Sequence, residues 1–351
     1  MNQAGGILQP VPRSVAAGYV RTLLDALRDQ RTAQPVSADQ VLREAGLSPA
    51  LLDSPEGRLP HDAVSAIWLA ALRLTGDSNL GLHVGEQVRP GSFDALGHLL
   101  MSSETLREAA AQADRFAPLV GGGGHFAARP EGADIRLFYM PFDPDWPCRR
   151  HRVEAVLTAT LTFTRWLCGR DIAPRSVRFR HAAPDGTTEH RRIFAAPVTF
   201  DAEDDSLLLA ADTLALPVRQ ASPALKGMLT DYADRALARL GDAAGDDDLR
   251  MRLAGCIRGL LACGHPPSID AAAAAMGLTP RTLQRRLAER GTGFQDEVAA
   301  LRCAMAKELL RDPGRSMASV AARLGFADVA NFHRAFKAWT GATPAQWRRG
   351  A

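Results

Sequence analysis

The sequence predicts an α+β domain over residues 1–220 and an all-α domain with two helix-turn-helix motifs, joined by a linker helix, over residues 249–351. Three observations support this division. A short helical pattern occurs twice near the C-terminus, helix-like and strand-like patterns alternate in the first part of the chain, and positive charge gathers at the C-terminal end. Between the two domains, residues 221–248 predict a connecting helix and an acidic linker.

Helices and strands are expected to interleave through the first domain, which indicates an α+β or α/β fold. Ser37 and Gln40 have the spacing of a capping box, and Gly46 is expected to end the helix that they begin. The other expected helices lie at 14–30, 60–74, 93–102, 104–118 and 149–168, and the expected strands at 125–129, 134–140, 176–181 and 197–209.

The junction between the domains is expected to be exposed. A helix from about residue 222 to residue 240 leads into the stretch 241–248, which is small, polar and acidic and has no apolar periodicity. Such a composition is typical of a linker.

The first helix-turn-helix motif extends from Ser268 to Leu287, with Gly277 in its turn. Thr279 is a favourable N-cap for the second helix of the motif, and Pro280 suits the first helical position, where its missing N–H is not needed. At 100° per residue, Leu283 and Leu287 form one apolar stripe that is expected to be buried. The side chains that then face away from the core are Arg281, Gln284 and Arg285.

The second motif, from Ser316 to Phe336, repeats this arrangement, and its turn residue Gly325 follows Gly277 by 48 positions. Asp328 is expected to cap its second helix, and Phe332 and Phe336 form the buried stripe. The polar side chains beside or opposite this stripe are Asn331, His333, Arg334 and Lys337.

The residue types on these two helices suit DNA. Arginine pairs with guanine edges and asparagine or glutamine with adenine, whereas lysine suits phosphate. A solvated basic face would explain one such helix equally well, but two matching helices favour DNA. We therefore expect base contacts from Arg281, Gln284, Arg285, Asn331, His333 and Arg334, and phosphate contacts from Thr279, Arg290 and Lys337.

The apolar-striped segment 294–310 predicts the linker helix between the motifs. Its 17 residues would extend over roughly 25 Å, which can brace two modules about one DNA turn, near 34 Å, apart. One chain can then address two successive segments of the major groove.

The charge of the chain is split in the same way. From His265 to Ala351 there are 13 Lys or Arg against 7 Asp or Glu, a net charge of +6, while the other 264 residues carry 29 against 32. A basic end on a slightly acidic body indicates that the nucleic-acid partner meets the C-terminal region. An architectural DNA protein without sequence preference should be far more basic.

Bulk composition excludes other classes. At 46% hydrophobic and 23% charged residues the chain is not disordered. It has no apolar run of about 18 residues and no secretory signal at its start, so we expect a cytoplasmic protein that does not bind a membrane. Five scattered cysteines without a CxxC pair, and histidines without metal-ligand spacing, lead us to expect no metal and no cofactor.

Several stretches of the C-terminal domain resemble the signature of the AraC/XylS family of bacterial transcription regulators. They are Leu283–Leu287, Gly291–Phe294, Leu324–Asp328, Phe332–Lys337 and Gly341–Arg348. The resemblance covers about residues 250–351. It implies a bipartite DNA-binding domain with recognition helices at about 280–290 and 329–339. The second of these begins with the apolar pair Val329 and Ala330, which departs from a polar reading surface and implies weaker base reading there.

The N-terminal domain resembles the arabinose-binding-type sensor domain of one branch of that family, through Gly91–His98, Pro197–Ala202 and Leu214–Pro217. This resemblance implies effector sensing by residues 1–220. The partners to expect are a double-stranded DNA operator and a small-molecule effector, with RNA polymerase and a second copy of the chain as further candidates.

A cluster of arginines is the candidate effector site. Arg149, Arg150, Arg178 and Arg180 can receive an anion such as a carboxylate, although a solvated basic face is the alternative.

No catalytic residue is expected. Cys148 and His151 have the spacing of a thiol–imidazole pair but lack an orienting carboxylate and an oxyanion signal. The alternative function, an enzyme fused to a DNA-binding domain, needs a nucleophile elbow or a metal site in residues 1–220, and the sequence contains neither pattern.

Overall fold

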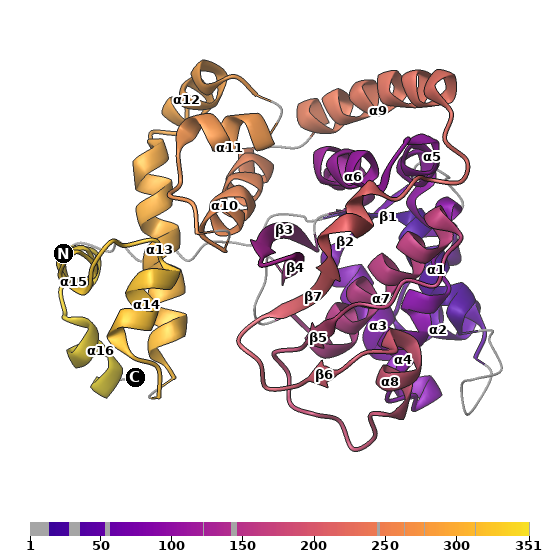
Figure 1. The fold of residues 1–351 in the computed structure, drawn as a ribbon, viewed down its shortest axis with the longest axis horizontal. Coiled ribbons are helices and arrows are strands. Elements are labelled where there is room, and N and C mark those ends of the chain that lie inside the picture. The colour runs from indigo at the N-terminus through magenta and orange to yellow at the C-terminus, as the bar shows by residue number, and fades with distance from the viewer. Residues whose placement is uncertain are drawn as a thin grey trace. The chain divides into compact units, whose positions relative to one another are not determined.

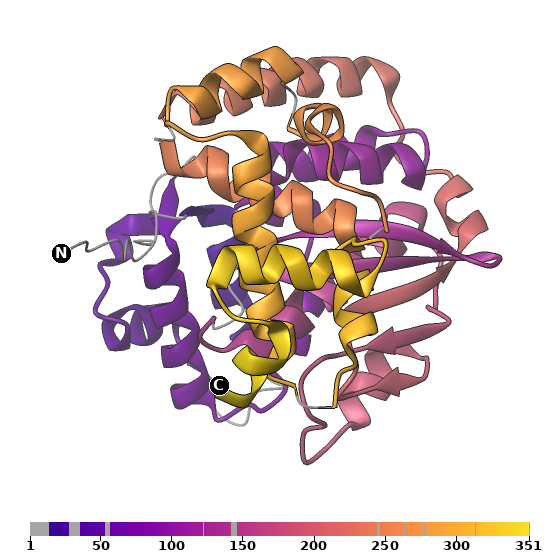
Figure 2. The same ribbon diagram turned by 90° about the vertical axis from the view of Figure 1, so that its left-hand side faces the viewer.

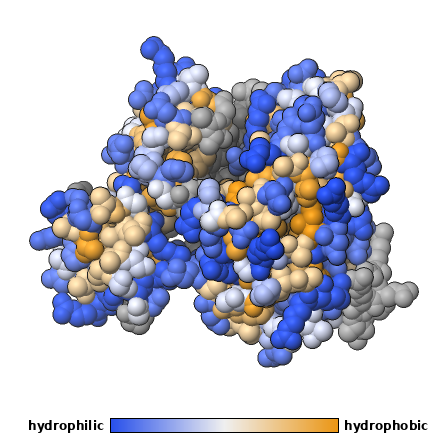
Figure 3. Space-filling model, viewed as in Figure 1, coloured by the Kyte–Doolittle hydropathy of each residue, from blue (hydrophilic) through white to orange (hydrophobic). Residues whose placement is uncertain are grey.

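The computed structural model describes residues 14–27, 36–52, 57–121, 123–141, 146–243, 246–262, 264–276, 278–312 and 314–350. The start of the chain, for which the sequence predicts no secretory signal, and the turn residue Gly277 lie outside these residues. Contacts divide the chain into two units, residues 1–248 and 249–351 (Figure 1). Within the described ranges, no helix is long and apolar enough to cross a membrane. Hydrophobic and hydrophilic residues mix on the face of both units that Figure 3 shows.

The first unit is built on a five-stranded sheet. Its strands pair antiparallel except for the last two, which are parallel. In spatial order they are β3 (Gly124–Glu131), β4 (Asp134–Pro141), β7 (Asp205–Ala210), β5 (Ser176–Arg178) and β6 (Val198–Thr199). The expected strand at 197–209 is therefore two strands, because the chain turns between them at Asp201, where φ is +51°.

The first unit also contains helices, and their mixture with strands confirms the α+β class. They are α1 (Ala17–Ala26), α2 (Ala38–Glu44), α3 (His61–Thr75), α4 (Leu80–Glu86), α5 (Asp94–Ser102), α6 (Leu106–Val120), α7 (Arg149–Cys168), α8 (Thr188–Phe194) and α9 (Pro223–Ala243), with short 3-10 turns η1 (Pro49–Leu52), η2 (Pro90–Phe93) and η3 (Ala211–Ala215). The capping box of Ser37 and Gln40 is present, and Gly46 follows α2 with φ of +70°.

The expected helix at 14–30 is wrong at its start. Residues Ser14–Ala16 form strand β1, which pairs antiparallel with β2 (Arg58–Pro60), and the helix begins at Ala17. The Arg58 guanidinium donates to the carbonyl oxygen and hydroxyl of Ser14 at 2.9 Å each, so a long-range contact overrides the local helical pattern. Residues 28–35 lie outside the described part of the chain.

Helix α7 joins the two hydrophobic cores of the first unit. Its residues Val153, Leu157 and Leu161 belong to the core beneath the sheet, and Ala155 belongs to the core formed by α1 to α4. It also packs on β4 and β7 (Figure 1). A shift of this helix would therefore disturb both cores.

Two glycines bring α4 and α7 into backbone contact. A Cβ atom on Gly81 would lie 2.1 Å from the carbonyl oxygen of His151, and one on Gly85 would lie 2.5 Å from Cβ of Thr158. Any side chain at either position must push the helices apart, since real Cβ contacts are not that short.

A histidine that lies between two carboxylates links α4 to α8. His83 Nδ1 lies 2.6 Å from Asp77 Oδ2, and its Nε2 lies 3.3 Å from Glu189 Oε2. The hydrogen bond to Asp77 raises the pKa of His83, and Glu189 adds to this, whereas burial opposes it. Arg192 also pairs with Glu189 at 2.7 Å.

Helix α9 packs against α5 and α6 through Leu229, Ala233 and Leu237. The described residues of the predicted linker 241–248 are helical, because α9 continues to Ala243 and the next helix, α10 (Asp246–Ala262), begins at Asp246, while residues 244 and 245 lie outside the described part of the chain.

The second unit is entirely helical within its described residues. After α10 it contains α11 (Ile269–Ala275), α12 (Pro280–Ala288), α13 (Phe294–Leu310), α14 (Met317–Arg323), α15 (Val329–Thr340) and α16 (Pro344–Gly350). The pairs α11–α12 and α14–α15 confirm both helix-turn-helix motifs, and α13 has the expected bounds. In Figures 1 and 2, α13 runs from the first motif to the second.

Each motif has its own core, and α13 supplies part of both. Phe294, Val298 and Leu301 pack with α10, α11 and α12, whereas Ala306 and Leu310 pack with α14 and α15. One rigid helix therefore fixes the separation of the two motifs.

Gly81→Ala should destabilise the first unit, because the added methyl group overlaps the backbone of α7. Overpacking of this kind costs about 1–3 kcal/mol. Gly227→Ala is the matched control, since this α9 glycine has no atom within 4 Å of its would-be Cβ. The control should gain about 0.5–1 kcal/mol from helix propensity. Calorimetric unfolding of the full chain measures both, and an equal gain from both substitutions would contradict the backbone contact.

His83→Gln should destabilise the first unit at pH 6 more than at pH 9. The folded pKa of His83 is raised, so its contribution is fully present below the ordinary histidine pKa and is lost as the pH rises through the folded value. Unfolding of wild type and variant across this pH range tests the prediction. A pH-independent difference would show that His83 is neutral in the folded protein.

Candidate nucleic-acid interface and ligand pocket

Helix α12 is fixed at its start and along one face. The Thr279 hydroxyl accepts a hydrogen bond from the Thr282 N–H at 3.2 Å, and Pro280 occupies the first helical position. Leu283 and Leu287 are fully buried, as the periodicity predicts. The backbone of α12 is therefore held firmly against its core.

The opposite face of α12 presents its polar side chains to solvent. Arg281, Gln284 and Arg285 are all exposed, and the Arg285 side chain is 69% exposed with Nε 3.9 Å from Glu289 Oε1. Such a weak surface pair leaves Arg285 able to reach a partner. Arg290 differs, because its Nη1 donates to the Arg286 carbonyl at 3.0 Å and its side chain lies back along the helix.

Helix α15 repeats this construction. Asp328 Oδ1 accepts from the Asn331 N–H at 2.6 Å and caps the helix, and Phe332 and Phe336 are fully buried. Phe332 also meets Phe326 with ring centroids 5.8 Å apart. Aromatic side chains on the buried side of α15 thus hold this helix in place, with its other face exposed.

The polar residues of α15 are less free than those of α12. Asn331 Nδ2 donates to Asp328 Oδ2 at 2.6 Å, and Asn331 Oδ1 accepts from Arg334 Nη2 in a short hydrogen bond. Both ends of the Asn331 amide are therefore engaged, and the amide orients Arg334. Arg334 and Lys337 are exposed, whereas His333 is half-buried with its ring against Phe332.

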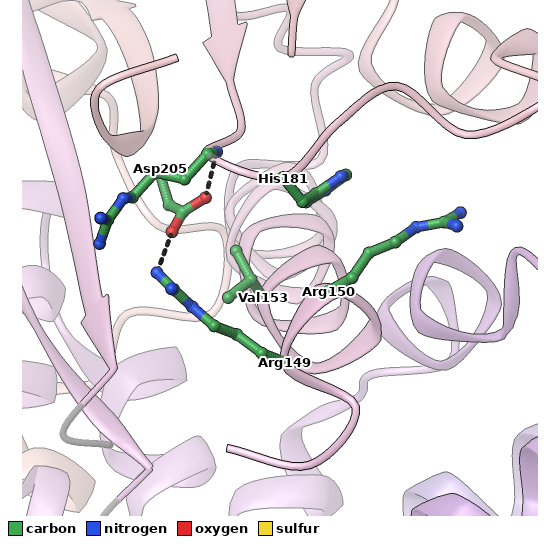
Figure 4. A pocket seen from close by; sticks show the side chains of 6 residues that line it. Arg149, Arg150, Val153, His181 and Asp205 are labelled. Carbon is green, nitrogen blue, oxygen red and sulfur yellow. Dashed lines mark hydrogen bonds and ion pairs between the residues drawn. The ribbon is translucent and has the colours of Figure 1, made fainter. Parts of the chain in front are cut away.

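The first unit contains a small pocket of about 190 Å³ at the start of α7 (Figure 4). Three candidate arginines line it together with three residues that the sequence did not single out. Its lining residues are Arg149, Arg150, Val153, Arg180, His181 and Asp205. The fourth candidate, Arg178, does not line this pocket, and its Nη1 lies 3.8 Å from Asp204 Oδ2.

Asp205 is the internal anion of this pocket. Its Oδ2 lies 3.3 Å from Arg149 Nη2, and its Oδ1 accepts from the Arg180 backbone N–H at 2.8 Å (Figure 4). Burial raises the pKa of Asp205, against the lowering effect of these two partners. Asp205 follows Arg149 by 56 positions, so no local spacing in the sequence joins them.

A second carboxylate, Glu154, lies fully buried one helical turn beyond Arg150. Its Oε1 lies 2.9 Å from His190 Nε2 and 3.0 Å from Arg150 Nε. Burial alone would raise the pKa of Glu154, but the hydrogen bond from His190 and the charge of Arg150 outweigh it and lower the pKa. This ionised side chain holds Arg150 in place.

The Cys148–His151 pair does not have the electrostatics of a catalytic dyad. Burial raises the pKa of the Cys148 thiol and lowers the pKa of His151, so both groups are driven toward their neutral forms. No group of three or more His, Cys, Asp or Glu side chains among the described residues can hold a metal ion.

Two families match this chain. The family described as the arabinose-binding domain of AraC transcription regulator, N-terminal, matches residues 36–218. The family described as a helix-turn-helix domain matches residues 272–350.

Several proteins are similar over most of the chain. The ornithine utilization regulator of Pseudomonas aeruginosa is 25% identical over 336 residues, which cover 95% of this chain and 96% of the relative. The HTH-type transcriptional regulator VirS of Mycobacterium tuberculosis is 28% identical over 216 residues, 62% of each chain. The crystal structure of the transcriptional regulator CdpR from Pseudomonas aeruginosa aligns with a TM-score of 0.45 and 23% identity, and the alignment covers 95% of this chain and 98% of that one.

Phe332→Ala should destabilise the second motif, although it replaces no side chain on the exposed face of α15. Truncation of a fully buried aromatic side chain costs about 3–5 kcal/mol. Thermal unfolding of the unit 249–351, which has cores of its own, measures the loss. Lys337→Ala, an exposed change on the same helix, should alter stability by no more than about 0.5 kcal/mol. Equal melting temperatures for the two variants would contradict the aromatic core.

Proposed function

The chain belongs to the AraC family of DNA-binding transcription regulators, and from that premise we propose that α12 and α15 read two successive major-groove segments of one operator. The observation that carries this proposal is the matched construction of the two helices. Each has a fully buried stripe on one side and exposed basic or amide side chains on the other. A helix so anchored presents its outer face to a groove without loss of its own packing.

Helix α13 supports simultaneous binding of both readers. It contributes to both motif cores, so the readers are held at a fixed separation. Its 17 residues extend over roughly 25 Å, and successive major-groove segments on one face of DNA repeat at about 34 Å.

The two readers are not equivalent. On α12 we assign base contacts to Arg281, Gln284 and Arg285, which are exposed and face the same way. On α15 we assign the base contact to Arg334 and a phosphate contact to Lys337. Asn331 is engaged by Asp328 and Arg334, which supports an orienting role.

The remaining contact candidates rank below these. His333 is half-buried, Thr279 uses its hydroxyl as a cap, and Arg290 lies against its own helix. Each has to change partner or conformation before it can contact DNA.

We further propose that residues 1–220 bind a small-molecule effector and that 221–248 connect this sensor to the DNA-binding residues 249–351. The packing of α9 on α5 and α6 supports the connection, because α9 follows the sensor and leads directly into α10. We propose that the chain has no enzymatic activity and that it binds DNA in the cytoplasm.

A second copy of the chain is the partner that α9 favours. Leu225, Met228 and Tyr232 are exposed large hydrophobic side chains at helical spacing on one side of this helix. Such a stripe is typical of helix pairing. RNA polymerase remains a candidate partner of the DNA-bound regulator.

Arg285→Ala should weaken operator binding and relax the preference at one or two base pairs. Loss of a bidentate base contact costs about 1–3 kcal/mol. Footprint titration of operator and random DNA with the full chain measures both effects. Arg311→Ala is the control, because Arg311 is exposed just beyond α13 and belongs to neither reader.

The comparison with random DNA is decisive. A base contact affects the operator alone, whereas a phosphate contact affects every sequence. Equal loss on both DNAs would therefore assign Arg285 to phosphate and remove α12 as the principal reader.

A further inference from the structure

The second motif is attached to α13 along one face of that helix. Ala306 and Leu310, which are four residues apart, are buried in the core of this motif, and the partly buried Met305 and Leu309 lie beside them. Packing along one face of a helix resists sliding, but it opposes rotation about the helix axis only weakly. The angle between the two proposed readers therefore depends on contacts that lie away from this face.

One such contact joins α10 to the turn of the second motif. Leu261, near the end of α10, is buried in the core of the first motif. Its Cδ2 atom lies 2.7 Å from the position that a Cβ atom on Gly325 would occupy. Gly325 belongs to the turn between α14 and α15 and has φ of +71°. A side chain of the first core thus meets the backbone of the second motif.

A second contact with the same turn comes from the middle of α13. Arg302 follows Leu301, which belongs to the first core, and precedes Ala306, which belongs to the second. Its guanidinium carbon lies 4.9 Å from the centre of the Phe326 ring, within the range of a cation–π contact. Its Nη2 donates to the carbonyl oxygen of Gly325 at 3.5 Å. Arg302 therefore contacts both residues of the turn.

The turn in turn contacts the second reader. The ring centroid of Phe326 lies 5.8 Å from that of Phe332 and 6.0 Å from that of Trp339, and both of these residues belong to α15. Phe332 is fully buried, so a displacement of Phe326 leaves a gap in a packed core unless α15 follows it. The orientation of α15 therefore depends on the position of the turn.

Helix α10 is itself anchored in the first motif, beside α13 (Figure 1). Leu253 and Ile257 are buried with Leu261 in the first core. The Arg250 Nη2 atom also lies 2.7 Å from Glu297 Oε1 on α13. Because α10 is held along its length, its end gives the turn of the second motif a fixed surface to rest on.

We propose that the contacts of Leu261 and Arg302 with the turn Gly325–Phe326 fix the rotation of the second reader relative to the first, and so determine which half-site spacing the chain accepts. The inference rests on the proposed reading of two half-sites by α12 and α15, and it names the residues that position these helices. Half-sites on one face of DNA lie about 10 base pairs apart, so one added base pair rotates a half-site by about 35°. Two readers that cannot rotate relative to each other should reject that spacing.

The test uses the full chain and the operator that the wild type selects from a pool of random DNA. Derivatives of this operator have one base pair added or removed between the half-sites. Leu261→Ala removes the contact from α10, and Arg302→Gln removes the guanidinium. Because Arg302 is only half-buried, its variant decides the test if Leu261→Ala destabilises the first core. Fluorescence anisotropy measures the affinity of each protein for each spacing.

Matched controls separate positioning from stability. Leu253→Ala truncates another buried leucine of α10 in the same core, and Lys307→Gln changes an exposed cation of α13. A loss of folded protein or of a phosphate contact lowers the affinity for every spacing alike. A loss of positioning changes the ratio between the affinities for the two spacings, so this ratio is the quantity to compare.

We expect the wild type to prefer its own spacing by roughly tenfold or more, since a misplaced reader loses base contacts. Leu261→Ala and Arg302→Gln should each reduce this ratio by roughly threefold or more, which lies within the range of coupling between residues in contact. Both controls should keep the wild-type ratio. An unchanged ratio in Arg302→Gln, a wild type without a spacing preference, or an equal reduction in either control would each overturn the inference.

Operators with one half-site scrambled separate this inference from the proposed function. If scrambling either half-site weakens wild-type binding but the spacing ratio is the same in all proteins, the two readers stand and the positioning role is wrong. If scrambling one half-site has no effect, only one helix reads DNA, so the proposed function fails and the inference fails with it.

Discussion

The contact between α4 and α7 is the constraint on which the first unit depends. Two helices approach this closely only where no side chain lies between their backbones. Gly81 and Gly85 have no side chain and lie on the surface of α4 that faces α7. The close packing of α4 on α7 holds α7 between the two cores and fixes the position of its first turn. The pocket arginines therefore project from a backbone that has little freedom to move.

In the second unit, one helix shared by both cores fixes the positions of the functional helices. Each motif packs its proposed DNA-reading helix on a core of its own, and α13 contributes apolar side chains to both cores. Because α13 is rigid, it sets the distance between the two proposed readers within one chain. In a dimer, symmetry would set that distance. The two helices differ, since α12 carries exposed polar groups that are only weakly paired, such as Arg285 with Glu289, whereas Asn331 and Arg334 of α15 form hydrogen bonds with Asp328 and with each other.

Local periodicity explains why the helices of the second unit were predictable. Leu283 and Leu287 are four residues apart, as are Phe332 and Phe336. Residues at this spacing lie on the same face of a helix, so the buried face of each helix can be recognised from a short stretch of sequence. Contacts between distant segments were not predictable in this way. The pairing of Ser14 with Pro60 converts an expected helix into a strand. The meeting of Arg149 with Asp205, and the exclusion of Arg178, depend on how β5 and β7 approach α7.

The separation of exposed and buried faces on α12 bears on how operator preference can change over evolutionary time. Arg281, Gln284 and Arg285, the base contacts proposed for α12, are exposed and take no part in the core, so new residue types there would alter the proposed recognition with little effect on stability. On α15 the same drift is restrained, because Asp328 caps the helix and also binds the amide that orients Arg334. On the proposed assignment of the readers, new specificities should arise first at the half-site of α12, while the half-site of α15 stays comparatively constant among descendants.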